Sequence, residues 1–193
     1  MLKKNLLRKQ IISIRNNLTD DFINLNSNLI VNKILLSNEF LSSKVIFLYL
    51  NAFKEVSLDR LISKCWDAKK SVCVPLVDKT TKTMTARIIN SWDDLLIGAY
   101  GIREPQNASE ANPASIDLIL IPAVAYDYSG FRLGMGAGFY DKYVQNLSAK
   151  TIKVGICWDL QLVQDTFPEA HDLSVDTIIT EQKTIRCQKG KMY

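Results

Sequence analysis

Two short runs of apolar residues limit the folds available to this chain more than any other feature. The run Val45–Leu50 reads Val-Ile-Phe-Leu-Tyr-Leu, and the run Asp117–Pro122 reads Asp-Leu-Ile-Leu-Ile-Pro. Successive side chains of a strand point to opposite faces, so a strand that is apolar throughout is buried on both faces. Strands of this kind lie at the centre of parallel sheets that helices cover on both sides.

Segments with helical spacing alternate with these strand-like runs along the whole chain. This alternation is typical of a mainly parallel sheet with helices on both faces. We therefore expect an α/β fold with three layers, α/β/α, and a Rossmann-like sheet, in a single domain over residues 1–193. The other predicted strands are Ser71–Pro75, Met84–Ile89 at an edge, Ile152–Cys157 and Val175–Thr180, and the predicted helices cover residues 7–18, 19–36, 57–65 and 141–147.

The first predicted helix carries three basic residues. Its apolar face, spaced at 3.6 residues per turn, comprises Leu7, Ile11, Ile14 and Leu18. Lys4, Arg8 and Arg15 flank this face or interrupt it. Lysine and arginine are mostly exposed in folded proteins, so spacing alone predicts three solvated surface cations.

The second predicted helix begins at a capping residue. Thr19 is a suitable N-cap, and Asp20 and Asp21 in the first turn favour a helix start. Its predicted apolar stripe comprises Phe22, Leu25, Leu29 and Leu36.

A cluster of glycines is the most unusual local feature of the sequence. Four of the eight glycines fall within nine residues, at Gly130, Gly134, Gly136 and Gly138. Glycine lets the backbone turn sharply, and consecutive bare N–H groups can form an anion-binding nest. The spacing matches neither the Walker A loop nor the dinucleotide fingerprint. Phosphate binding and a purely structural turn therefore both remain open.

Two charged residues border this glycine segment. Arg132 offers a planar cation that suits phosphate or carboxylate. Asp141 follows the last glycine, where the Mg²⁺ of a bound nucleotide would find an oxygen ligand.

Other candidate residues lie in connections that can meet at one crevice. Glu55 follows the first apolar strand, and ligands of open α/β sheets bind outside the carboxyl ends of strands. An ordinary exposed loop glutamate is an equally good interpretation. His171 is the only histidine; with no visible partner it is better interpreted as a structural or surface residue. Asp172 by itself is better interpreted as a turn residue.

Composition excludes several classes of protein. The four cysteines are far apart and form no Cys-x-x-Cys pair, which disfavours a zinc or redox site. No apolar run approaches the roughly 18–20 residues that span a bilayer, so we expect a cytoplasmic protein that does not bind a membrane. The net charge of +4 is compatible with anionic ligands.

With these residues in place, the sequence resembles the 5-formyltetrahydrofolate cyclo-ligase family over nearly its whole length. The most specific part of the match comprises Asp117–Pro122, Ala125–Asp127 and the segment Arg132–Asp141. Individually weaker matches are Lys4, Arg8, Glu55-Val56, Gly101–Pro105, Gln161, His171-Asp172 and Thr180-Glu181.

The resemblance implies a reaction. It is the ATP- and Mg²⁺-dependent cyclisation of 5-formyltetrahydrofolate to 5,10-methenyltetrahydrofolate, in which phosphorylation activates the formyl oxygen and ADP and phosphate are released. Phosphoryl transfer depends on charge neutralisation and positioning, which agrees with the absence of a nucleophile motif. We expect a monomer that binds these small molecules and no nucleic acid.

The resemblance also implies roles for individual residues. Arg132 would stabilise the charge of the transferred phosphoryl group. The implied ATP-binding residues are Lys4, Arg8, Arg132, Leu133, Gly134, Met135, Gly136, Ala137, Gly138, Phe139 and Tyr140. The implied folate-binding residues are Arg8, Leu50, Glu55, Met135, Gly136, Ala137, Gly138 and Phe139. The implied Mg²⁺ ligands are Asp141 and Asp172.

Some positions depart from the commonest family pattern. Phe139 and Lys142 stand where tyrosine and arginine are frequent, and both keep much of the chemistry. Ala137 stands where some members carry lysine, which removes one potential phosphate contact. Ser57 and Leu58 replace an acidic residue and a threonine.

Two other functions remain open at this point. The first is an enzyme of the same architecture that binds a nucleotide or sugar phosphate without folate. The second is a nucleic-acid-binding module that uses the N-terminal cations Lys3, Lys4, Arg8, Lys9 and Arg15. Few aromatic residues lie among these cations, which weakens the second alternative.

Overall fold

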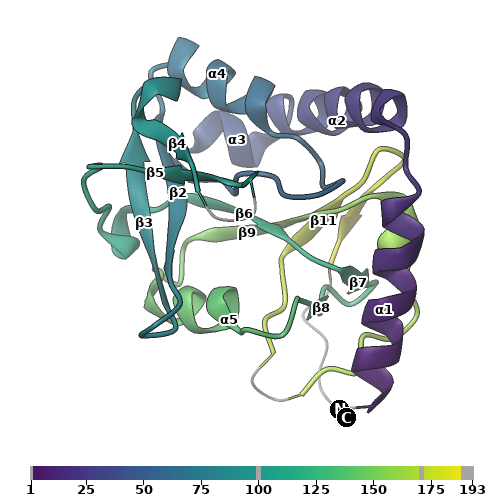
Figure 1. The fold of residues 1–193 in the computed structure, drawn as a ribbon. Coiled ribbons are helices and arrows are strands. Elements are labelled where there is room, and N and C mark those ends of the chain that lie inside the picture. Colours follow the sequence, from purple (N-terminus) through teal and green to yellow (C-terminus); the bar gives the residue numbers. More distant parts are fainter. Residues whose placement is uncertain (1, 99–100, 170–171, 188–193) are drawn as a thin grey trace.

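A twisted sheet of seven strands forms the centre of the computed structural model, which describes residues 2–98, 101–169 and 172–187 (Figure 1). The strand order is β12-β11-β9-β6-β1-β2-β3. The strands β11, β9, β6, β1 and β2 run parallel, whereas the edge strands β12 and β3 are antiparallel to their neighbours. Their bounds are β1 Val45–Phe47, β2 Ser71–Asp78, β3 Thr83–Ile89, β6 Leu118–Pro122, β9 Ile152–Ile156, β11 Thr177–Ile179 and β12 Thr184–Arg186. The prediction of a mainly parallel sheet is confirmed.

Helices cover both faces of this sheet. The helices α2, α3 and α4 lie over one face and α5 lies over the other, while α1 stands beside one end of the sheet (Figure 1). Their bounds are α1 Leu2–Asn16, α2 Asp20–Leu35, α3 Asn38–Ser42, α4 Asp59–Asp67 and α5 Phe139–Tyr143. The predicted α/β/α layers are therefore present.

Strand alternation explains why the central strands are apolar throughout. Ile46, Leu118 and Leu120 face the core under α2 and α4. Phe47 and Ile119 face the opposite core, which α5 helps to close. Each central strand thus contributes to two separate hydrophobic cores.

Two small sheets lie outside the central one. The strands β7 (Ala125–Asp127), β8 (Arg132–Leu133) and β10 (Leu162–Val163) form one, and β4 (Leu95–Ile97) pairs with β5 (Arg103–Pro105) in the other. Ile11 of α1 packs on Val124, Ala125 and Leu133 in a third core. This contact places α1 directly over the start of the glycine segment.

The predicted cap of the second helix is right, but its predicted apolar stripe is wrong except at Phe22, which packs against the core. Thr19 Oγ1 accepts a hydrogen bond from Phe22 N at 3.2 Å. Leu25, Leu29 and Leu36 are 66%, 43% and 82% exposed. The buried face instead comprises Ser27, Ile30, Val31 and Ile34. The helix has apolar residues on two sides, and the contact with the sheet selects the compact β-branched side.

The predicted face of the first helix is also partly wrong. Ile11 is buried, but Ile14 is exposed, and Arg15 is buried in its place. The expectation that Arg15 is a solvated cation is therefore incorrect, because its guanidinium meets a carboxylate inside the protein.

Smaller differences concern the ends of elements. Residues 92–94 form a short 3-10 turn and 95–97 form the strand β4. The helix predicted for 141–147 begins earlier, at Phe139. Near the C-terminus, Thr184–Arg186 adds the edge strand β12 to the main sheet.

Candidate active site

A cavity of about 620 Å³ opens at the carboxyl ends of β1, β2 and β6. The chain leaves β1 for β2 on one side and later returns to β6 on the other side of β1. Loops diverge at such a reversal of strand order, and ligands of open α/β sheets bind there. The predicted residues that line the cavity are Lys4, Arg8, Glu55, Asp172 and every residue from Arg132 to Asp141.

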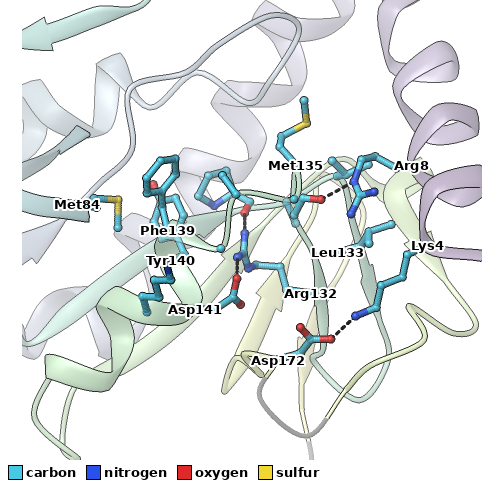
Figure 2. A pocket seen from close by; sticks show the side chains of 18 of the residues that line it. Lys4, Arg8, Met84, Arg132, Leu133, Met135, Phe139, Tyr140, Asp141 and Asp172 are labelled. Carbon is cyan, nitrogen blue, oxygen red and sulfur yellow. Dashed lines mark hydrogen bonds and ion pairs between the residues drawn. The ribbon is translucent and has the colours of Figure 1, made fainter. Parts of the chain in front are cut away.

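The glycine segment forms one wall of the cavity (Figure 2). Gly136 and Gly138 have φ angles of 106° and 71°, in the region that favours glycine. An added Cβ at Gly138 would meet nothing within 4 Å, so this glycine is required by the backbone conformation and not by crowding. Met135 is 67% exposed at the mouth.

Arg132 is fixed by contacts on several sides. Its Nη2 lies 2.7 Å from Asp141 Oδ2, and its guanidinium lies 5.4 Å from the centre of the Tyr140 ring. Only 6% of the side chain is exposed, and Nε is buried without a hydrogen-bond partner. A buried guanidinium of fixed orientation presents its charge to the cavity without first reorganising.

The helix α1 contributes two cations to the same wall (Figure 2). Lys4 Nζ lies 2.5 Å from Asp172 Oδ2 and 3.1 Å from Glu169 Oε1. Arg8 Nε donates to the carbonyl oxygen of Gly134 at 2.8 Å. Because the two residues are four positions apart, they share one face of the helix. Spacing alone predicted solvated surface cations here, and that expectation is wrong.

The acidic partners of Lys4 affect its titration. Burial lowers the pKa of Lys4, but hydrogen bonds and charge interactions with Asp172 and Glu169 outweigh burial, so the pKa is raised overall. The ammonium group is therefore retained at neutral pH.

The residue that follows Asp172 in the chain contacts Asp141. Asp141 Oδ1 accepts from Leu173 N at 3.3 Å. Within the described parts of the chain, no three His, Cys, Asp or Glu side chains are grouped so as to hold a metal. Mg²⁺ is commonly bound through one or two carboxylates together with substrate phosphates. Asp141 and Asp172 supply two carboxylates beside a cavity wall that suits phosphate, and this set fits that ion.

Glu55 also lines the cavity and is not an ordinary exposed glutamate. Its side chain is 18% exposed. Burial raises the pKa of Glu55, while a hydrogen bond from Ala52 N and the charge of Arg15 act in the opposite direction.

An apolar part of the cavity wall was not predicted. It comprises Pro75 and Val77 of β2 and Met84 of β3. The second strand was predicted to end at Pro75, whereas β2 continues to Asp78. The alternation of Pro75 and Val77 was the signal that could have placed both side chains on one face.

Some of the candidate site residues do not line the cavity. Leu50 is buried in the core under α2 and α4. Gln161 is buried too, and its Nε2 donates to the carbonyl oxygens of Ala123 and Val124 at 2.8 and 2.9 Å. Since Ala123 and Val124 line the cavity, Gln161 supports its floor. His171 lies outside the described residues.

Three of the five N-terminal cations considered for a nucleic-acid-binding module turn inward. Lys4 and Arg8 line the cavity and Arg15 pairs with Glu55. Lys3 and Lys9 remain exposed, so the basic surface on which that alternative rested is reduced to two of its five cations.

Comparison with known proteins places the chain in a family. Residues 1–181 match the sequence profile of the 5-formyltetrahydrofolate cyclo-ligase family. The chain belongs to this family. Members are ligases, so the protein is an enzyme of that class.

Relatives of this cyclo-ligase cover almost the whole chain. The probable 5-formyltetrahydrofolate cyclo-ligase of Schizosaccharomyces pombe is 30% identical over 200 residues, covering 96% of this chain and 98% of the relative. The 5-formyltetrahydrofolate cyclo-ligase of Haemophilus influenzae is 32% identical over 181 residues, covering 92% and 97%. The NMR structure of Aquifex aeolicus 5,10-methenyltetrahydrofolate synthetase superimposes with a TM-score of 0.86 at 31% identity, covering 100% of this chain and 96% of that one.

Among the helices within the described ranges, none is both long enough and apolar enough to cross a bilayer.

The support that Gln161 gives to the cavity floor is testable. Gln161→Leu keeps the size of the side chain but leaves two buried carbonyls and the N–H of Trp158 without their partner. Each unpaired buried group costs about 1–3 kcal/mol, so we expect the free energy of unfolding, measured in urea, to fall by about 3 kcal/mol. The matched control is Gln164→Leu in the same connection, where the side chain is exposed. Equal stability of the two variants would contradict the supporting role.

Proposed function

We propose that this cyclo-ligase converts 5-formyltetrahydrofolate and ATP into 5,10-methenyltetrahydrofolate, ADP and phosphate, with Mg²⁺ bound at the nucleotide. The observation that carries the proposal is that one cavity has two chemically different ends (Figure 2). Lys4 and Arg8 lie at one end beside the glycine-rich backbone, Met84 and Phe139 lie at the other, and Arg132 lies between them. Glu55 is also among the lining residues. A polyphosphate suits the first end and a flat, hydrogen-bonding heterocycle suits the second.

The cationic end is suited to bind the triphosphate. Lys4, Arg8 and Arg132 neutralise its charge, and the segment Arg132–Tyr140 offers backbone N–H groups around it. Ala137 supplies no cation where some relatives have lysine, so these three side chains have to carry the charge. Phosphoryl transfer needs this neutralisation and positioning more than it needs a side-chain nucleophile.

Asp141 and Asp172 would hold the magnesium ion. When bound, Mg²⁺ supplies positive charge to the phosphate oxygens and fixes their orientation. Asp141 now pairs with Arg132, and Asp172 with Lys4. When a nucleotide binds, each carboxylate would therefore gain the metal as an additional partner. Each cation would gain a phosphate oxygen.

The apolar end is suited to bind the reduced folate. The pterin ring carries N–H groups on one edge, and an ionised carboxylate at Glu55 accepts hydrogen bonds from them. Pro75, Val77 and Met84 then contact the apolar surface of the ligand, with Phe139 on the glycine segment. Leu50 supports this end from the core, and its contact with folate stays a prediction.

The proposed reaction has two steps. The formyl oxygen attacks the γ-phosphorus, an O–P bond forms, and the bond to ADP breaks. The neighbouring folate nitrogen, N10, then attacks the formyl carbon and releases its proton to the departing phosphate or to solvent, and the C–O bond breaks as phosphate leaves. In this scheme Arg132 stabilises the charge of the transferred group, because its guanidinium is already fixed at the wall where the phosphoryl group would lie.

Three further expectations accompany this function. The enzyme is expected to be cytoplasmic and monomeric, and residues 1–193 are expected to form a single catalytic domain.

The activity can be tested by absorbance. Cyclisation extends the conjugation of the folate, so purified protein with 5-formyltetrahydrofolate and MgATP should produce a new near-ultraviolet band. Omission of ATP or chelation of Mg²⁺ should abolish its growth. Bound ATP without this band under complete conditions would contradict the folate function and would favour an enzyme that uses another substrate.

The metal assignment can be tested at Asp141. Asp141→Asn keeps the shape of the side chain but removes the charge that would bind Mg²⁺ and pair with Arg132. We expect the KM for MgATP to rise at least about tenfold, which corresponds to about 1.4 kcal/mol, while the affinity for 5-formyltetrahydrofolate changes little. Asp67→Asn, at an exposed ion pair on α4, is the matched control. Equal losses for both substrates would count against the assignment.

A further inference from the structure

The second arginine of α1 is buried behind the lining of the cavity. Arg15 is in the last turn of the helix and only 7% of its side chain is exposed. Its Nη1 lies 3.3 Å from Glu55 Oε1, and Glu55 lines the cavity. Lys4 and Arg8 on the same helix line the cavity directly. An arginine is rarely buried without a partner, so this pair requires an explanation.

The backbone that carries Glu55 is fixed without help from Arg15. Glu55 N donates to the carbonyl oxygen of Ala52 at 2.9 Å. The indole of Trp158 donates to the carbonyl oxygen of Lys54 at 2.8 Å, and the Lys54 ammonium pairs with Asp20. These contacts hold the loop while leaving the orientation of the Glu55 carboxylate to be set separately.

Each carboxylate oxygen of Glu55 accepts one hydrogen bond from the protein. Ala52 N donates to Oε2 at 2.9 Å, and Arg15 Nη1 donates to Oε1 at 3.3 Å. Each oxygen therefore has one protein donor and a remaining lone pair for a ligand. Without Arg15, Oε1 would lose its protein donor and the carboxylate would be free to rotate away from Ala52.

The charges around Glu55 also point to Arg15. Burial favours the neutral acid, and Arg15 is the cation that opposes burial among the described groups acting on Glu55. Tyr49 at the end of β1 and Tyr140 of α5 also face it, and burial raises the pKa of both phenols, so both stay neutral. Burial raises the pKa of Glu55 overall, and the charge of Arg15, together with the hydrogen bond from Ala52 N, opposes that rise and favours the ionised form.

We propose that Arg15 is a positioning residue that holds the Glu55 carboxylate in the orientation that accepts hydrogen bonds from the reduced folate. This inference rests on the proposed function, because it assumes that Glu55 binds folate. Arg15 itself does not line the cavity, and it acts through Glu55.

A double-mutant cycle tests this proposal. The affinity for 5-formyltetrahydrofolate and, separately, for MgATP is measured by calorimetry for wild type, Arg15→Gln, Glu55→Gln and the double variant. We expect Arg15→Gln to weaken folate binding about tenfold with little effect on MgATP. In the Glu55→Gln background, removal of Arg15 should weaken folate binding less than about twofold, because the carboxylate is already absent.

Two further measurements separate positioning from folding. Arg15→Lys keeps the charge but loses the planar fork, so it should recover part of the lost affinity. The deficit of Arg15→Gln should shrink as the pH rises, since removal of the cation raises the pKa of Glu55 further and higher pH restores its ionised form. Lys9→Gln, an exposed charge change on the same helix, is the matched control and should leave both affinities unchanged.

The outcomes distinguish this proposal from the proposed function. If Glu55→Gln weakens folate binding but Arg15→Gln does not, only the positioning role is overturned. Additive losses in the double variant, or equal losses for folate and MgATP with a lowered melting temperature, would show that Arg15 merely supports the fold. If Arg15→Gln does not fold, the same double-mutant cycle is measured with Arg15→Lys and Glu55→Gln, and that cycle tests the positioning role. If Glu55→Gln leaves folate affinity intact, the folate role of Glu55 fails, and the positioning role with it.

Discussion

The pairing of β1 with β6 is the constraint on which the rest of the structure depends. These two parallel strands are neighbours in the sheet but are far apart in the chain, which first builds β2 on the other side of β1. Their following connections must therefore leave in different directions, and the space between them becomes the cavity. One connection brings Glu55 and the other leads into Ala123 and Val124, over which α1 packs. The apolar strands thus determine where a ligand can bind before any polar residue is considered.

A second feature of the site is that its buried charges are paired. Arg132 pairs with Asp141, Lys4 with Asp172 and Arg15 with Glu55. An uncompensated charge inside a protein is costly, so a cavity built for a highly charged ligand has to balance its own charges when the ligand is absent. Two of these pairs combine a proposed phosphate-binding cation with a proposed metal-binding carboxylate. A nucleotide that binds together with its metal brings negative phosphates and a positive ion, so the charges in the site remain balanced.

Much of this arrangement could be predicted from the sequence, and the exceptions have physical reasons. The central strands were predictable because apolar runs such as Val45–Leu50 admit few other structures. The glycine segment was identifiable from its composition, although spacing alone left a structural turn open. The buried face of α2 was not predictable, because two apolar sides compete and only the contact with the sheet decides between Leu29 and Ile30.

Contacts between distant segments account for the other errors. Arg15 looked like a surface cation because its partner, Glu55, is 40 positions away. The cavity wall at Met84 depends on how far the β2–β3 hairpin extends, and strand ends are poorly defined by local pattern. The resemblance to the cyclo-ligase family selected Lys4 and Arg8 when spacing pointed the other way, and the structure brings both side chains to the cavity.

The central claim is that the formyl oxygen of the folate is activated by phosphorylation, and isotope transfer tests it most directly. 5-Formyltetrahydrofolate labelled with ¹⁸O in the formyl group is converted by the enzyme with unlabelled MgATP in unlabelled water. The two-step reaction predicts that the label appears in inorganic phosphate, because the C–O bond breaks after the O–P bond has formed. Label found in water, with none in phosphate, would contradict phosphoryl activation.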